Sequence, residues 1–261
     1  MTHITLKLTL AAACLAALAG CNLPNPEARQ WLKDSSAAAA AGENDRAIQL
    51  SSRFLQEYPK LEESAEAYYI RGLARSRTDQ RAPARDDLEA ALKLTKRKDL
   101  LALAHMELGS MAYQADDVPG SESHFRAVLV NLPPAQSPAD QAAYRLARVL
   151  QRQGRWNDAD LFFDRVIYLF PQGELSRLAR TQVRATHWAI QAGAYADPTQ
   201  AQNTQRRLSQ AGLSAQVDKE MRDDSLMYLV RVGSFATLEA GQSDLEKVKR
   251  LCRDAFMTAA R

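Results

Sequence analysis

A spacing of 37 to 38 residues recurs along the chain and constrains its fold more than any other feature. The spacing separates four small residues: Ser35, Gly72, Gly109 and Ala147. Twelve residues after each stands another small residue: Ala47, Ala84, Ser121 and Ala159. Seven residues further on come Phe54, Ala91, Val128 and Val166. Self-similarity at a fixed period of this length indicates stacked repeats of one supersecondary unit.

The residue types at these positions predict pairs of antiparallel helices. Small residues let two helices approach closely, and the apolar residues Leu88, Phe125 and Phe163 fill the seam between them. Helix breakers occupy one shared phase within each unit: Gly42, Asp79, Asp116 and Gly154. Pro59, Pro133 and Pro171 follow the second helix, which proline cannot continue. The alternative is chance alternation in an alanine-rich helical bundle.

This spacing of small, apolar and proline residues resembles tetratricopeptide repeats. Four units are assigned, to residues 28–61, 65–98, 102–135 and 140–173. Repeats of this family stack into a solenoid whose concave surface binds another protein. We expect the protein-binding groove to be lined by aromatic, Met and Arg side chains of the first helices: Tyr69, Arg77, Met106, Tyr113, Tyr144 and Arg148.

The hydrophobic period changes from helical to alternating near residue 186, after a capping helix or linker at 174–185. Strands are expected at 187–193, 214–221, 226–233 and 255–259, with helices at 197–211 and 237–252. The order is therefore βαββαβ. Its two halves are alike, because Ala-Ile-Gln-Ala-Gly-Ala-Tyr at 189–195 aligns with Leu-Val-Arg-Val-Gly-Ser-Phe at 229–235.

Residues 186–261, with both half-motifs, resemble the SPOR domain. The resemblance implies a four-stranded antiparallel sheet with both helices on one face, so the fold class is a mostly α solenoid followed by a small α+β domain. It also implies that the other face binds glycan strands of peptidoglycan, especially septal strands that lack stem peptides. Gln191, Tyr195, Arg231 and Phe235 are the expected glycan-binding residues. For both aromatics, packing under the helices is the competing interpretation. Ala194-Tyr195 departs from the family's Ser-Phe.

The N-terminus reads as a secretory signal at residues 1–20, with a single cation, Lys7, before an apolar run. Leu18-Ala19-Gly20-Cys21 resembles the lipobox of bacterial lipoproteins, which implies acyl chains such as palmitate on Cys21. Residues 21–27 would be the lipidated N-terminus and linker. Asn22 replaces the Asp that typically retains such lipoproteins on the inner membrane, so an outer-membrane anchor facing the periplasm is expected. An ordinary signal peptide containing a cysteine is the alternative.

Several kinds of chemistry are not predicted. The net charge is only +3, which disfavours nucleic acid as a partner. No zinc-ligand spacing, nucleophile motif or phosphate loop occurs, so no metal, cofactor or catalytic residue is expected. The acidic pair Asp86-Asp87 is interpreted as a solvated helix surface. An enzyme remains an alternative only because a glycosidase needs no more than two nearby carboxylates.

Together these features predict a non-enzymatic envelope lipoprotein that acts in cell division or wall remodelling. Its terminal domain would bind peptidoglycan and its repeats would recruit a protein. The alternative is an assembly scaffold, in secretion or pilus biogenesis, whose terminal domain binds protein instead of glycan.

Overall fold

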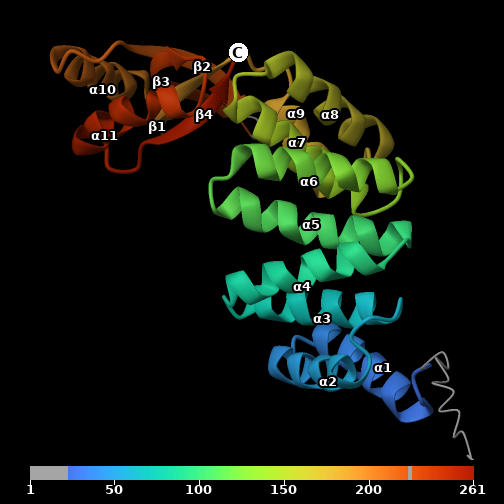
Figure 1. Cartoon of the computed structure of the whole chain (residues 1–261). Coiled ribbons are helices and arrows are strands. Elements are labelled where there is room, and N and C mark those ends of the chain that lie inside the picture. Colours follow the sequence, from blue (N-terminus) through green and yellow to red (C-terminus); the bar gives the residue numbers. More distant parts are fainter. Residues whose placement is uncertain (1–22, 223–224) are drawn as a thin grey trace, which may run out of the picture.

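The computed structural model describes residues 23–222 and 225–261, and it consists of a helical solenoid joined to a small sheet domain (Figure 1). Cys21 and the expected signal segment lie outside the described residues. Four antiparallel helix pairs form the solenoid: α1 (Pro26–Ala40) with α2 (Asn44–Glu57), α3 (Ser64–Arg77) with α4 (Arg81–Leu94), α5 (Lys98–Gln114) with α6 (Val118–Asn131), and α7 (Ala139–Arg152) with α8 (Trp156–Leu169). The helix α9 (Glu174–Gln182) follows. None of the described helices is long and apolar enough to span a bilayer.

The small residues of the repeat lie where the two helices of a pair touch. A Cβ atom added to Gly72 would come within 2.9 Å of Leu88 Cγ, and one added to Gly109 within 2.8 Å of the Phe125 ring. Leu88 and Phe125 are completely buried. The sequence prediction that small residues admit the seam side chains is therefore confirmed, and the fold is a solenoid of the predicted class.

All four predicted breakers adopt left-handed backbone conformations at the turn between paired helices. The φ angles are 79° at Gly42, 59° at Asp79, 61° at Asp116 and 75° at Gly154. Glycine takes this conformation without steric cost, and Asp is among the few other residues that visit it. The breakers thus end the first helix of each pair and reverse the chain.

Asp87 corrects one expectation, because it is buried and paired, not solvated. Its carboxylate accepts hydrogen bonds from Arg71 Nη2 at 2.7 Å and from Arg75 Nη1 at 2.7 Å. Both arginines belong to α3 and Asp87 to α4, so the cluster joins the two helices of the second repeat. A buried carboxylate is tolerated only when it is paired in this way.

The terminal domain has the predicted βαββαβ order. Its elements are β1 (His187–Tyr195), α10 (Pro198–Gln210), β2 (Ala215–Arg222), β3 (Ser225–Phe235), α11 (Gln242–Leu251) and β4 (Phe256–Ala260). All neighbouring strands pair antiparallel in the spatial order β2-β3-β1-β4. The second helix starts later than expected, because a 3₁₀ turn at Glu239–Gly241 occupies the segment after Thr237.

Helices α10 and α11 cover one face of the sheet and build the domain core. Ile190, Ala192, Val230 and Val232 of the sheet pack there, against Leu208 and Val248 among others. Cys252 is buried in the same core as a free thiol. The opposite face of the sheet carries no helix of this domain and is called the open face below.

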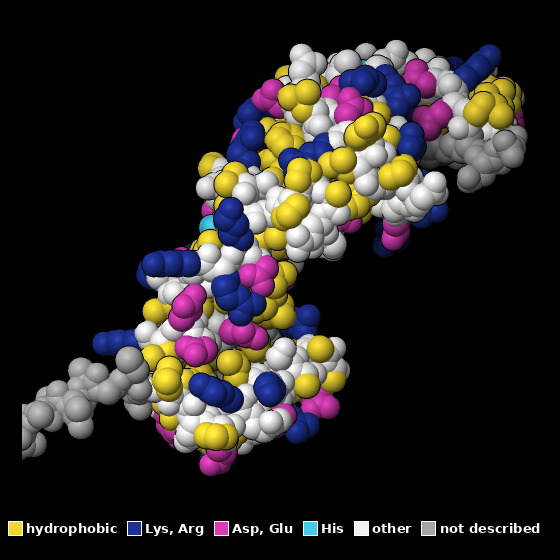
Figure 2. All heavy atoms as spheres, turned by 90° about the vertical axis from the view of Figure 1, so that its right-hand side faces the viewer, with side chains coloured by type: hydrophobic (Ala, Val, Ile, Leu, Met, Phe, Trp, Pro, Cys, Tyr) yellow, Lys and Arg dark blue, Asp and Glu magenta, His cyan; other side chains and the backbone are white. Residues whose placement is uncertain are grey.

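The face of the molecule seen in Figure 2 shows no field of a single charge sign that would suit a polyanion. In the view of Figure 2, basic and acidic side chains are interspersed along the solenoid, and hydrophobic side chains gather between them. This agrees with the net charge of only +3. Interspersed charge favours solubility, and it provides little long-range attraction for nucleic acid.

Two histidines meet head to head in the third repeat. His105 Nδ1 of α5 lies 3.0 Å from His124 Nδ1 of α6, so one ring must donate and the other accept. Burial lowers the pKa of both imidazoles; at His105 the neighbouring His124 lowers it further, and at His124 Asp117 and Glu89 oppose the shift whereas Arg85 adds to it. Two protonated rings at this distance would repel each other.

This pair predicts a loss of stability on acidification. Both folded-state pKa values lie below the ordinary value, about 6.5, so unfolding takes up protons once the pH falls below that value. The free energy of unfolding should therefore decrease from pH 7 to pH 5, less steeply in a His105→Gln/His124→Gln variant. Urea denaturation across this range measures the difference. Equal slopes for the two proteins would contradict the assignment.

Candidate functional site: a groove, an open sheet face and their junction

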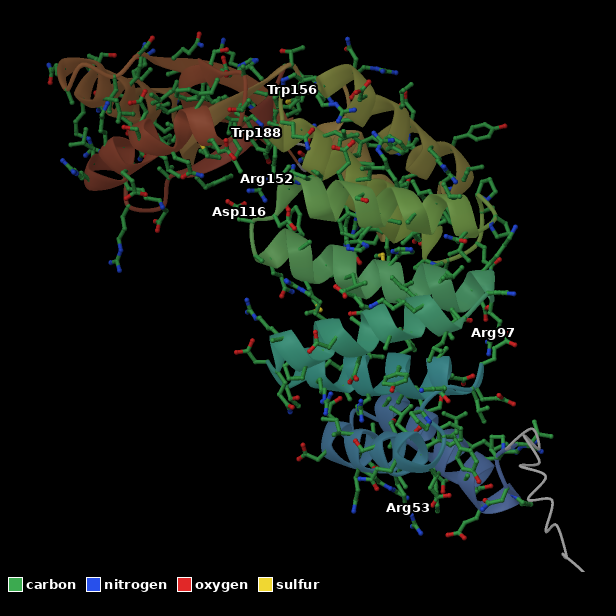
Figure 3. The ribbon with its side chains drawn as sticks, in the orientation of Figure 1. Arg53, Arg97, Asp116, Arg152, Trp156 and Trp188 are labelled. Carbon is green, nitrogen blue, oxygen red and sulfur yellow. The ribbon has the colours of Figure 1, made fainter. Side chains whose placement is uncertain are left out.

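The solenoid and the terminal domain are joined by a buried tryptophan. Trp188 of β1 is 1% exposed, and its indole N–H donates to the Gln151 carbonyl oxygen of α7 at 2.8 Å. Its ring packs against Trp156 of α8, with centroids 5.7 Å apart, and the Arg148 guanidinium lies 5.5 Å from its centroid. Figure 3 shows the two tryptophans side by side where the domains meet. Such a side chain is as buried as any core residue.

Backbone contacts reinforce this junction at the α7–α8 turn. The Leu238 amide donates to the Arg152 carbonyl oxygen at 3.2 Å. A Cβ added to Gly154 would lie only 2.6 Å from the Ala236 carbonyl oxygen. Gly154 therefore serves two purposes, because it supplies the left-handed turn of its repeat and also makes room for the loop that follows β3.

A groove of about 650 Å³ runs along the first helices of the second, third and fourth repeats. Five of the six residues expected to line the protein-binding groove do line it: Arg77, Met106, Tyr113, Tyr144 and Arg148. Tyr69 is not in the lining, because it packs partly buried against the neighbouring repeat cores. Glu107, Ser110 and Arg145 also line the groove, and sequence reasoning did not single them out.

The groove has a distinctive charge arrangement. Burial raises the pKa of the Glu107 carboxyl, and the nearby Arg145 and Arg77 oppose this shift. Burial also raises the pKa of Tyr69 to about 12, with Glu107 adding to the effect. The arginines therefore do not fully offset the effect of burial on the pKa of Glu107. Because the lining contains three arginines and one acid, its formal charge is positive.

The open face of the sheet is centred on Arg231 of β3. Its guanidinium donates to Asp218 and to Glu220 of β2, at 2.9 Å each, and its side chain is 17% exposed. Gln191 pairs with Arg231 across β1 and β3, and with Phe256 across β1 and β4. Phe256 is 51% exposed on this face. The face thus offers a guanidinium, two carboxylates and one aromatic ring.

Both aromatic residues expected on the glycan face lie on the opposite side. Tyr195 and Phe235 pack against the helix-covered core, and the Tyr195 hydroxyl accepts from Thr204 Oγ1 at 3.0 Å. The reason is a register shift in each half: between Gln191 and Gly193 on β1, and between Trp188 and Ile190 opposite the end of β3. One extra residue in a strand reverses the facing of every residue beyond it.

Gln191 also departs from expectation, because it is on the open face but only 6% exposed. Its amide is therefore not freely presented to a ligand. Asp218, Glu220 and Phe256 were not predicted from the sequence as residues of this face. The alternation of Gln216, Asp218 and Glu220 was a signal for the two acids, since residues two apart in a strand share a face.

Comparisons with known protein families agree with this division. Residues 185–257 match the SPOR domain family, and residues 141–173 match a tetratricopeptide repeat family. The chain thus carries the two kinds of domain that its sequence predicted. SPOR domains suggest peptidoglycan binding and tetratricopeptide repeats suggest protein interaction, and both are typically non-catalytic. A comparison with curated proteins finds no match.

Two solved structures are similar to part of this chain. The apo form of RapI aligns with a TM-score of 0.52 at 15% identity, over 59% of this chain and 46% of RapI. MamA aligns with a TM-score of 0.48 at 20% identity, over 56% of this chain and 79% of MamA. At these identities the similarity to RapI concerns the fold alone.

Substitutions at Gly42 and Gly154 distinguish the free energy that depends on a left-handed turn from the free energy that depends on the domain junction. Gly42 and Gly154 hold equivalent turns at φ 79° and 75°, but only Gly154 has a neighbour within 4 Å of an added Cβ. Gly42→Ala should cost about 1–2 kcal/mol of unfolding free energy from backbone strain. Gly154→Ala should cost about 1–3 kcal/mol more from overpacking against Ala236. Chemical denaturation measures both, and equal costs would contradict a tight junction.

Proposed function

We propose that this chain is an outer-membrane lipoprotein, acylated at Cys21 and facing the periplasm, that binds peptidoglycan glycan strands and recruits a protein partner. The glycan would be denuded strands of the division septum, which assigns the protein to cell division or wall remodelling. The open face would bind glycan, and the groove would bind the partner. No step of this function requires catalysis, a metal or a cofactor.

One observation carries the proposal: a SPOR domain whose second sheet face carries no helix of that domain and exposes side chains around a buried centre of Ala189, Gln191 and Leu229. Sugars present hydroxyl and acetamide groups, which the carboxylates of Asp218 and Glu220 and the guanidinium of Arg231 can bind through hydrogen bonds. The exposed Phe256 ring can cover an apolar sugar face. This set replaces the expected set of Gln191, Tyr195, Arg231 and Phe235, of which only Arg231 keeps an accessible polar group on that face.

Three attachments would reinforce each other in this arrangement. Lipid insertion, wall contact and partner contact each raise the local concentration for the other two, so the wall contact needs no high affinity. The anchor would act at the opposite end of the solenoid from the terminal domain, which lies beside the last helices, α7 to α9 (Figure 1). The length of the solenoid would then separate membrane and wall contacts.

The test is co-sedimentation of the chain from residue 22 onward with purified sacculi, either untreated or stripped of stem peptides by an amidase. Stripped sacculi should pellet more protein. Phe256→Ala should reduce pelleting several-fold, because loss of one stacked ring costs about 1 kcal/mol or more. Leu161→Ala, at an exposed position on α8 outside the terminal domain, is the matched control and should pellet like the unaltered chain.

Absence of pelleting with both preparations would refute the glycan proposal. Equal pelleting with stripped and untreated sacculi would refute only the preference for denuded strands. Point substitutions are preferable to removal of the terminal domain, because removal would expose Trp156 and the α7–α8 turn that the domain covers.

A protein-assembly scaffold is the second candidate, and one observation favours it. Arg231 is already neutralised by two carboxylates, and the end of the β2–β3 hairpin exposes Met221 and Leu226. Exposed apolar side chains at the tip of a hairpin suit a protein surface. In that case the terminal domain would bind a protein during secretion or pilus assembly, and neither the unaltered chain nor Phe256→Ala would pellet with sacculi.

A further inference from the structure

Three arginines face the groove without a carboxylate partner. Arg77 of α3 donates to the Ala39 carbonyl oxygen at 2.7 Å, Arg145 of α7 donates to the Ser110 hydroxyl, and Arg148 of α7 donates to the Gln182 amide oxygen. Each acceptor is neutral. Among the described residues, none of the three forms an ion pair.

Several other partly buried arginines of this chain do have carboxylate partners. Arg71 and Arg75 share Asp87, Arg231 has Asp218 and Glu220, and Arg155 has Glu122 and Asp158. Carboxylates thus pair with several partly buried guanidinium groups elsewhere in the described chain. The groove arginines lack that compensation, although two of them are half-buried.

Glu107 is the single acidic residue of the groove lining, against three arginines. It lies on α5, between the arginines of α3 and those of α7, and it forms no ion pair within the described part of the chain. The formal charge of the lining is therefore +2, from three cations and one anion. Tyr113, Tyr144 and Met106 add an apolar and aromatic wall beside the cations.

We propose that this groove binds an extended acidic segment of a partner protein, with at least two carboxylates received by Arg77, Arg145 and Arg148. The inference rests on the proposed protein-binding role of the repeats and specifies the chemistry of the partner. Guanidinium groups bond carboxylates in charge-assisted, often bidentate, geometry, and exchange of neutral acceptors for carboxylates strengthens each bond. The tyrosines and Met106 would contact the apolar side chains of the segment.

The experiment is selection of a displayed library of random twelve-residue peptides on the chain from residue 22 onward. Enriched peptides should carry Asp or Glu at two or more positions. A selected peptide should bind the unaltered chain at least about tenfold more tightly than its copy with Gln in place of Glu and Asn in place of Asp, since a bond to a charged group contributes about 1.5–3 kcal/mol. Fluorescence anisotropy measures both affinities.

Substitutions then assign the binding to the groove. Arg145→Gln should weaken binding of the selected peptide about tenfold or more, and Glu107→Gln should tighten it, because the competing acid is removed. Tightening distinguishes a ligand-binding role from a merely structural one. Arg53→Gln is the matched control, because Arg53 lies on α2 of the first repeat, outside the groove lining (Figure 3), and its loss should leave the peptide affinity unchanged.

The outcomes separate this inference from the proposed function. Enrichment of neutral or basic peptides that compete for the groove would overturn the acidic specificity and leave the groove as a protein-binding site. Equal enrichment of the same peptides on the unaltered chain and on an Arg77→Gln/Arg145→Gln variant would overturn both the acidic specificity and the assignment of protein binding to the groove. Displacement of the selected peptide by stem peptides released from sacculi would overturn the inference and assign the groove to the wall.

Discussion

The burial of Trp188 is the interaction on which the arrangement of this protein depends. Its side chain belongs to the first strand of the terminal domain, yet its N–H donor is bonded by α7 and its ring is covered by Trp156 and Arg148. A buried indole contributes both apolar area and a satisfied donor. The solenoid and the terminal domain are therefore packed against each other. At Gly154 the backbone of the loop after β3 comes so close that a larger residue would not fit.

The same stretch of α7 forms the end of the groove and the seat of the domain. Arg148 lines the groove and covers Trp188, while the Arg152 guanidinium lies 5.4 Å from the Tyr113 ring and pairs with Asp116. The backbone carbonyl oxygen of Arg152 accepts a hydrogen bond from the Leu238 amide of the terminal domain. Groove and junction thus share helix positions one turn apart. A ligand that moves Arg148 would act directly on the packing of Trp188.

The periodicity of the sequence was sufficient to predict the solenoid of helix pairs, because the same steric requirements recur in each repeat. Gly72 and Gly109 had to be small where Leu88 and Phe125 fill the seam, and four breakers in one phase had to reverse the chain. The faces of the strands were less predictable, because one-residue register shifts cannot be read from alternation and moved Tyr195 and Phe235 to the core. The contact between the two domains was not predictable from the sequence either. The strand alternation marks Trp188 as buried, but it does not show that residues of the solenoid bury it.

The central claim is that one chain holds a groove and an open sheet face in a fixed mutual orientation. Pulsed electron paramagnetic resonance tests it directly in the chain from residue 22 onward, with spin labels on Ser123→Cys of α6 and Gln202→Cys of α10, both at exposed positions, while Cys252 stays buried and unlabelled. A single narrow distance distribution, broadened by Trp188→Ala, is the result we expect. A broad distribution in the chain with native Trp188 would contradict the claim, because it would mean that the two domains move independently.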